Sequence, residues 1–162
     1  MIDIFIDALT NSVINRQTEE VFQTEIKEVL VHELDDTISW NFNWKQELRQ
    51  SLVFKVTTTA TPNLIEGLVS LEIRQGFVFV SLVENAPHNI GKNGVYVGVA
   101  GNLFAFACQL SLNKGYGGYV SFVAKTELIE HYKKMLSAEI LFGKNMVIKE
   151  DAALNLIQKY FN

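Results

Sequence analysis

The turn at residues 98–102 has the composition of an anion-binding site. Its sequence, Gly-Val-Ala-Gly-Asn, precedes the apolar residues 103–112, which predict a helix. The first N–H groups of a helix have no intrahelical acceptor, and the positive end of the helix dipole lies behind them. Glycine has no Cβ and therefore lets a ligand approach the backbone. The turn predicts either a phosphate-binding site or a tight helix entry without a ligand.

The histidines and the cysteine give weaker chemical signals. His88 lies in a polar loop after an apolar strand, where it would face a substrate, whereas His32 and His131 lie on charged helix surfaces. Their spacing to other His, Cys or acidic residues is not that of metal ligands, so we expect no metal site. Cys108 is the single cysteine, which excludes an internal disulfide. We expect it to be a buried packing residue, because a nucleophilic cysteine needs a paired base.

The composition is that of a folded protein with an acidic balance. The chain has 162 residues, of which 48% are hydrophobic and 20% charged, enough for a core in one domain. The net charge is -4 and no basic block is present, so we expect no nucleic-acid partner. The sequence contains no apolar run of membrane-spanning length, and its first residues lack the features of a signal peptide. We expect a cytoplasmic protein with no membrane partner.

Hydrophobic periodicity indicates the elements that must position the turn. Strands are predicted at residues 2–8, 21–29, 52–59, 67–74, 77–83 and 119–123, with a hairpin at 138–148. Helices are predicted as two short segments between 31 and 50, and at 103–112, from 126 onward and at 150–161. Asn43 and Thr126 are the expected N-caps. Residues 11–12 and 15–18 have the composition of turns.

The connections between these elements determine the expected sheet. Short links require the strands at 52–59, 67–74 and 77–83 to pair antiparallel. The strand at 77–83 is apolar on both faces, which places it in the middle of the sheet. The order strand, helix, strand from 77 to 123 predicts a right-handed crossover with parallel strands. We therefore predict an α+β fold with a mixed, mostly antiparallel sheet and helices on both faces.

The order of elements and two motifs resemble the GNAT family of N-acetyltransferases over residues 52–148. The family's signature turn reads Gln/Arg-x-x-Gly-x-Gly/Ala with a leucine three residues on. The corresponding residues here are Val95-Tyr96-Val97-Gly98-Val99-Ala100, followed by Leu103. The family also has a tyrosine shortly before a Gly-Phe pair on the helix after the next strand, and Tyr132 is similar. Val95 departs from the signature's Gln or Arg, and Ser137-Ala138 stands where the Gly-Phe pair would be.

The resemblance implies a GNAT-like (acyl-CoA N-acyltransferase) fold and the cofactor acetyl-coenzyme A (acetyl-CoA). The cofactor diphosphate would lie on the turn, and its pantetheine arm would lie along the end of the strand that begins at residue 77. The residues implied to bind it are Leu82, Val83, Val97, Gly98, Val99, Ala100, Gly101, Asn102 and Lys125, with Lys92 as another candidate cation. The contact that Gln or Arg would make is missing at Val95. Residues 1–162 would form one domain, with an extension at 1–50, a core at 52–148 and a closing helix at 149–162.

The reaction that the resemblance implies is direct transfer of an acetyl group to an amine. It requires an unprotonated amine, a polarised thioester carbonyl and a proton for the departing thiolate. Tyr132 is the candidate acid, Glu84 is the candidate base, directly or through a water, and N–H groups near residues 82–85 are candidates for polarising the carbonyl. A carboxylate acts as a base near neutral pH only when its pKa is raised. Each residue also fits a plain role, Tyr132 in the core and Glu84 in a solvated loop.

Two other functions agree with the same residues. One is a GNAT-like module that binds CoA or an acyl carrier without catalysis, which the departures at Val95 and Ser137 favour. The other is an interaction or toxin-type protein in which the fold has lost its cofactor. For the enzyme, the partner is a small-molecule amine or an amine-bearing peptide, and the acidic chain favours a cationic acceptor. Both a monomer and a homodimer remain open.

Overall fold

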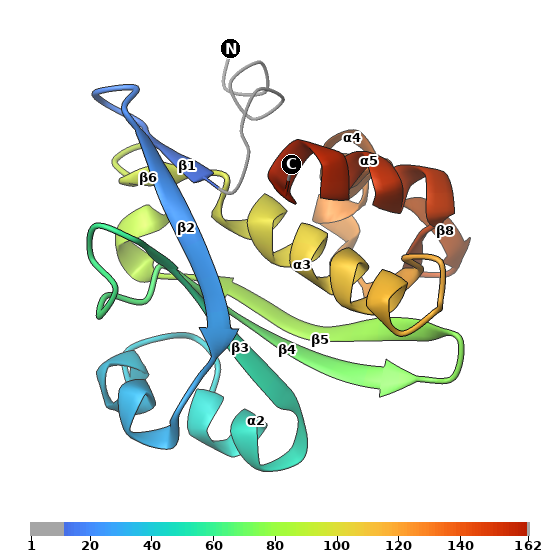
Figure 1. The fold of residues 1–162 in the computed structure, drawn as a ribbon, viewed down its shortest axis with the longest axis horizontal. Coiled ribbons are helices and arrows are strands. Elements are labelled where there is room, and N and C mark those ends of the chain that lie inside the picture. Colours follow the sequence, from blue (N-terminus) through green and yellow to red (C-terminus); the bar gives the residue numbers. More distant parts are fainter. Residues whose placement is uncertain (1–11, 162) are drawn as a thin grey trace.

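A continuous sheet runs through the computed structural model, which describes residues 12–161 (Figure 1). Its strand order is β6-β1-β2-β3-β4-β5-β7-β9-β8. Among these strands, β5 and β7 pair in parallel and the other neighbours pair antiparallel. The predicted mixed, mostly antiparallel sheet is therefore confirmed. The strand predicted at residues 2–8 lies outside the described residues.

The first half of the described chain forms one side of the sheet and a helical cover. Its elements are β1 (Ser12–Asn15), β2 (Val21–Glu28), the 3-10 helix η1 (Val31–Thr37), α2 (Trp44–Gln50), β3 (Leu52–Thr58) and β4 (Gly67–Arg74). The two short helices predicted between residues 31 and 50 are confirmed. Asn43 is the N-cap of α2, since its side chain accepts a hydrogen bond from the Gln46 N–H at 3.1 Å.

The second half carries the parallel crossover. Its elements are β5 (Phe77–Asn85), the 3-10 helix η2 (Pro87–Asn89), β6 (Tyr96–Val97), α3 (Val99–Asn113), β7 (Val120–Val123), the 3-10 helix η3 (Thr126–Leu128), α4 (Ile129–Leu136), β8 (Glu139–Phe142), β9 (Asn145–Ile148) and α5 (Glu150–Phe161). The parallel pairing of β5 with β7 confirms the predicted crossover. Thr126 is not the N-cap of the following α-helix, because a 3-10 turn comes first and Leu128 occupies the cap position.

Strand β1 is an element that the sequence prediction missed. Residues 11–12 were expected to form a turn, but the strand begins at Ser12 and pairs with β2 on one side and with β6 on the other. Ser12, Val13 and Ile14 are buried. A strand this short is stable because both neighbours supply hydrogen bonds and apolar contacts, and local sequence does not reveal those neighbours.

Helices cover both faces of the sheet, as predicted (Figure 1). One face packs against α3, α4 and α5, and its core includes Leu103, Phe104 and Phe122. The other face packs against η1 and α2, where Leu34 and Trp44 are buried with Leu68 of β4. Within residues 12–161 no helix has both the length and the apolar character needed to cross a membrane.

Helix α3 is the central element of the larger core. It begins at Val99, one turn earlier than predicted, so the glycine turn is partly its first turn. Leu103, Ala105 and Cys108 are fully buried. Burial raises the pKa of the Cys108 thiol to about 12, which keeps it protonated. Cys108 is therefore a buried packing residue, as expected.

Replacing Leu103 by Ala should destabilise the protein strongly, because Leu103 is 0% exposed and the substitution leaves a cavity. We expect a loss of about 2–5 kcal/mol in the free energy of unfolding, measured by urea denaturation. The matched control is Leu112→Ala on the same helix, where Leu112 is 36% exposed and the loss should be below about 1 kcal/mol. Equal losses for the two variants would contradict the central role of α3.

Candidate functional site

The parallel strands β5 and β7 separate in the middle of the sheet. Their register ends at Val80 and Phe122, whereas β5 continues to Asn85. The β4–β5 ladder is irregular at the same level, because Leu82 pairs with Ser70 while Val80 pairs with Leu71, which leaves Ser81 as an extra residue. A bulge of this kind bends a strand and changes its direction. The bulge at Ser81 therefore accounts for the divergence of β5 from β7.

A cavity of about 400 Å³, here called the splay cavity, lies where these strands diverge. Leu82 and Val83, two of the predicted cofactor-binding residues, line it together with Lys125. Its remaining lining residues come from β5, β7, α3, the η3–α4 segment and two loops: Asn41, Phe42, Val80, Ser81, Glu84, Asn85, Ile90, Phe104, Phe122, Val123, Leu128 and Tyr132. The cavity thus brings both predicted catalytic residues, Tyr132 and Glu84, to one place.

Tyr132 reaches the splay cavity from α4. Its ring packs edge-on against Phe104 and Phe122, with centroid separations of 5.7 Å and 5.0 Å. Within the described chain its hydroxyl makes no hydrogen bond. Burial raises the pKa of the phenol above its ordinary value, so the group stays protonated through neutral and mildly alkaline pH. A held, protonated and unbonded hydroxyl has the properties of a proton donor.

Glu84 is engaged in a structural task that the sequence did not reveal. It is 6% exposed, and its carboxylate accepts hydrogen bonds from the Asn41 N–H at 2.7 Å, the Phe42 N–H at 3.1 Å and the Trp44 indole N–H at 2.9 Å. Glu84 is therefore not the solvated loop carboxylate that the plain alternative described. The geometry also favours an anchor over the predicted base, because both oxygens are already bonded to the loop before α2.

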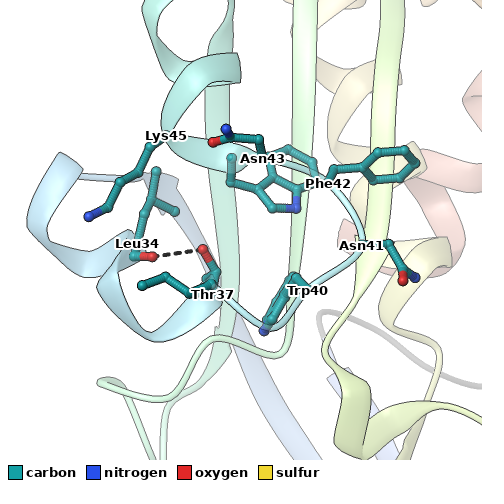
Figure 2. Close-up of a pocket in the computed structure, with 9 residues that line it drawn as sticks. Leu34, Thr37, Trp40, Asn41, Phe42, Asn43 and Lys45 are labelled. Atoms are coloured by element: carbon teal, nitrogen blue, oxygen red, sulfur yellow. Dashed lines mark hydrogen bonds between the residues drawn. The ribbon is translucent and has the colours of Figure 1, made fainter.

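The anchored loop separates the splay cavity from a smaller aromatic cavity of about 290 Å³. Figure 2 shows this second cavity, with Leu34 and Lys45 on one side of the loop and Asn41 and Phe42 on the other. The Thr37 hydroxyl donates a hydrogen bond to the Leu34 carbonyl at 2.7 Å and stabilises the preceding turn (Figure 2). Asn41 and Phe42 line both cavities, so the loop forms a wall of the candidate site.

A third cavity, here called the turn cavity, lies at the start of α3 and has a volume of about 470 Å³. The predicted residues that line it are Val97, Gly98, Val99, Ala100 and Gly101. Gly98 has a φ of 99°, a left-handed conformation that favours glycine. The first helical hydrogen bond of α3 runs from the Asn102 N–H to the Gly98 carbonyl. The N–H groups of Val99, Ala100 and Gly101 precede it and have no helical acceptor.

Two of the predicted turn residues have other tasks. The Asn102 N–H is bonded within the helix, and its side-chain amide donates to the Ser12 and Gly98 carbonyls at 2.9 Å and 2.8 Å. Asn102 is 0% exposed and is absent from the lining of the turn cavity. Its side chain ties the start of α3 to β1, and its contact with a cofactor stays a prediction. Gly101 lines the cavity, but a Cβ there would collide with the ring and hydroxyl of Tyr160. Glycine at position 101 therefore leaves the space that Tyr160 of α5 occupies.

The turn cavity has cationic walls that sequence reasoning did not identify. They are formed by Arg16 of the β1–β2 turn, Lys134 of α4 and Lys159 of α5, and His131 of α4 also lines the cavity. Neither Lys125 nor Lys92 lines this cavity, and Lys125 lies instead at the splay cavity. The β1–β2 turn, α4 and α5 are all distant from the glycine turn in sequence, so no local pattern connects their side chains to it.

Asn85 connects the two cavities. It lines both of them, at the end of β5, and its side-chain oxygen is buried without a hydrogen-bond partner. A buried carbonyl oxygen without a partner is costly and is a candidate acceptor for an N–H of a ligand. The turn cavity and the splay cavity therefore form adjoining parts of one candidate site.

His88 lies outside both cavities. Its Nε2 atom is 2.7 Å from an oxygen of Glu66, whose side chain is almost fully buried and also accepts a hydrogen bond from the Asn89 amide. The expectation that His88 faces a substrate is thus not supported by the cavity linings. In the part of the chain that the structure describes, no group of three or more His, Cys, Asp and Glu side chains has a metal-binding arrangement.

Solved structures of acetyltransferases resemble this chain, although no protein-family model and no curated protein sequence matches it. Mutant forms of the spermidine/spermine N-acetyltransferase SpeG from Vibrio cholerae align with a TM-score of 0.58 and 16% identity, over 82% of this chain and 98% of theirs. A GNAT-family acetyltransferase from Listeria monocytogenes aligns with a TM-score of 0.55 and 10% identity, over 85% of this chain and 97% of its own. AtaTR bound with acetyl-CoA aligns with a TM-score of 0.53 and 12% identity, over 82% of this chain and 97% of its own. The chain therefore has the GNAT, or acyl-CoA N-acyltransferase, fold, as the resemblance implied.

Replacing Glu84 by Gln should release the loop before α2, because an amide offers one acceptor oxygen where the carboxylate offers two. We expect the free energy of unfolding to fall by about 2–3 kcal/mol, measured by urea denaturation, with a change in tryptophan fluorescence from Trp44. The control is Glu130→Gln on the exposed surface of α4, which should be nearly neutral. Unchanged stability of the Glu84 variant would argue against the anchoring role and return this carboxylate to consideration as a base.

Proposed function

We propose that this protein is an acetyl-CoA-dependent N-acetyltransferase that acts on an amine. The observation that carries the proposal is the pair of adjoining cavities. One has three N–H groups without helical acceptors and cationic walls, and the other has the Tyr132 hydroxyl between two diverging strands. SpeG and AtaTR, which share the fold, are respectively a spermidine/spermine N-acetyltransferase and a protein crystallised with acetyl-CoA.

The residues present fit acetyl-CoA. The N–H groups of Val99, Ala100 and Gly101, with the cationic walls of the turn cavity, suit the diphosphate. The buried side-chain oxygen of Asn85 suits an amide N–H of the pantetheine arm. Leu82 and Val83 belong to the part of β5 beyond its pairing with β7, where an extended ligand would add as a strand. Lys125 contributes positive charge at the splay cavity.

The chemistry requires few residues. Bound acetyl-CoA supplies an activated acetyl group and a thiolate leaving group. Tyr132 holds a proton at its phenol oxygen, at the cavity where the leaving group would form, and the raised pKa keeps that proton in place. Unpaired N–H groups of β5 beyond Val80 are the candidates for polarising the thioester carbonyl. The aromatic packing of Phe104 and Phe122 around the Tyr132 ring holds that ring in position at the cavity.

The acceptor side of the site is formed by the anchored loop. Asn41 and Phe42 line the splay cavity there, and Glu84 holds both of their N–H groups. Among the described residues Glu84 is the single carboxylate in the lining of this cavity. Since its oxygens are bonded, we propose that the acceptor reacts as the free amine, that the proton lost by its nitrogen on acylation passes to water, and that Glu84 positions the loop beside the cavity.

Acetyl-CoA should raise the melting temperature of the protein. At about a hundred times its dissociation constant, a ligand that binds only the folded state adds about 2.7 kcal/mol. This corresponds to a shift of about 5–10 °C for a domain of this size, measured by differential scanning fluorimetry. Adenosine, which lacks the phosphates and the thioester, is the control and should produce no comparable shift. No shift with saturating acetyl-CoA would overturn the proposed function.

Replacing Tyr132 by Phe should lower kcat by about 100-fold while leaving the affinity for acetyl-CoA nearly unchanged, because the substitution removes only the donated proton. The rate is measured as thiol release with a panel of primary amines, including spermidine. Tyr119→Phe is the control, since Tyr119 precedes β7 at the end far from the splay cavity. An unchanged kcat in the Tyr132 variant would exclude the acid role. Binding without turnover by the unmodified protein would favour the non-catalytic module.

A further inference from the structure

Arg16 occupies a fixed position beside the signature turn. The Asn15 side chain accepts hydrogen bonds from the Gln17 and Thr18 N–H groups, both at 3.0 Å, and so closes the turn after β1. The Arg16 N–H donates to the Val95 carbonyl at 2.8 Å. The backbone of Arg16 is thus held on both sides, and its side chain starts next to the position where the GNAT signature has Gln or Arg and this chain has Val95.

The half-buried side chain of Arg16 has a donor that no described residue satisfies. The residue lines the turn cavity, where Gly98, Val99 and Ala100 expose the start of α3. Its Nε atom is buried and makes no hydrogen bond, and Arg16 forms no ion pair within the described chain. A buried donor without an acceptor costs free energy, so native proteins rarely keep one without a reason. An anion in the turn cavity would satisfy it.

We infer that Arg16 binds a phosphate group of the ligand in the turn cavity and supplies, from the β1–β2 turn, the side-chain contact that Val95 cannot make. The inference rests on the proposed function. It extends that function by assigning phosphate recognition to a residue outside the signature. A guanidinium suits this task, because it is always charged and its planar fork matches two phosphate oxygens at once.

The same arrangement selects a class of ligand. The turn cavity combines Arg16 with cationic residues of α4 and α5 and with three N–H groups that lack helical acceptors. This density of donors and positive charge matches a ligand with more than one phosphate, such as the phosphorylated nucleotide end of CoA. An acyl group on pantetheine without phosphates would leave Arg16 unpaired. The site therefore favours a free CoA thioester over an acyl-pantetheine.

Affinity measurements with two ligands test the inference. Isothermal titration calorimetry compares acetyl-CoA with S-acetylpantetheine on the unmodified protein, on Arg16→Ala and on the control Arg49→Ala. Arg49 lies on α2, a helix of the opposite sheet face, so the control removes the same charge away from the cavity. We expect Arg16→Ala to weaken acetyl-CoA binding by about 10-fold to 100-fold and to leave S-acetylpantetheine unaffected.

A rescue variant separates binding from folding. Because Arg16→Ala retains the N–H that bonds to Val95, the tie between β1 and the signature turn persists, and the melting temperature without ligand should match that of Arg49→Ala. Adding Val95→Arg to Arg16→Ala should recover most of the lost affinity for acetyl-CoA. Equal affinity of Arg16→Ala and Arg49→Ala, or a loss that Val95→Arg does not recover, would overturn the inference. Failure of the unmodified protein to bind acetyl-CoA would instead overturn the proposed function, and the inference with it.

Discussion

The separation of β5 from β7 is the constraint on which the rest of the site depends. A regular parallel pair would bond along its whole length and leave no space for a ligand, so the register must end where it does, at Val80 and Phe122. The bulge at Ser81 turns β5 away, and the rings of Phe104, Phe122 and Tyr132 fill the base of the gap. Apolar packing of α3 and α4 against β7 stabilises an opening that backbone hydrogen bonds alone would close.

Glu84 extends this arrangement to the other face of the sheet. It lies on the diverging part of β5 and holds the Asn41–Trp44 segment through three hydrogen bonds. A buried carboxylate is tolerated when several donors surround it, and here the donors come from the loop before α2 and from the first residue of that helix. The strand that forms the opening therefore also positions one of its walls, which links the geometry of the gap to the loop.

Much of the fold could be predicted from the sequence, because the relevant signals are local. Three local patterns each define an element without reference to the rest of the chain: the β-branched run that ends β3, the Gln75-Gly76 turn and the apolar stripe of α3. Strand β1 escaped prediction because its stability comes from neighbours distant in sequence. Thr126 has the residue type of a helix cap, but a 3-10 turn precedes α4 and displaces the cap to Leu128.

The candidate site was only partly predictable, for the same reason. The glycine turn was predicted from its residue types and Tyr132 from the resemblance to the GNAT family, and the structure places them at two cavities that adjoin at Asn85. Arg16 and Lys159 reach the turn from elements far away in the chain, so spacing carries no information about them. Residue type also did not reveal the structural roles of Asn102, whose amide donates to the Ser12 carbonyl, and of Gly101, which leaves room for the Tyr160 ring.

The turn cavity is built from both ends of the described chain, which has a consequence for its dynamics. Arg16 lies near the first described residue and Tyr160 near the last, and both line the same space. Bringing segments so distant in sequence together costs loop-closure entropy. The turn cavity therefore forms only when nearly the whole chain is folded. Any fluctuation that detaches α5 or the β1–β2 hairpin removes a wall while the central strands stay paired. Amide exchange in these two peripheral elements, rather than in β4 or β5, would therefore report the opening of the site.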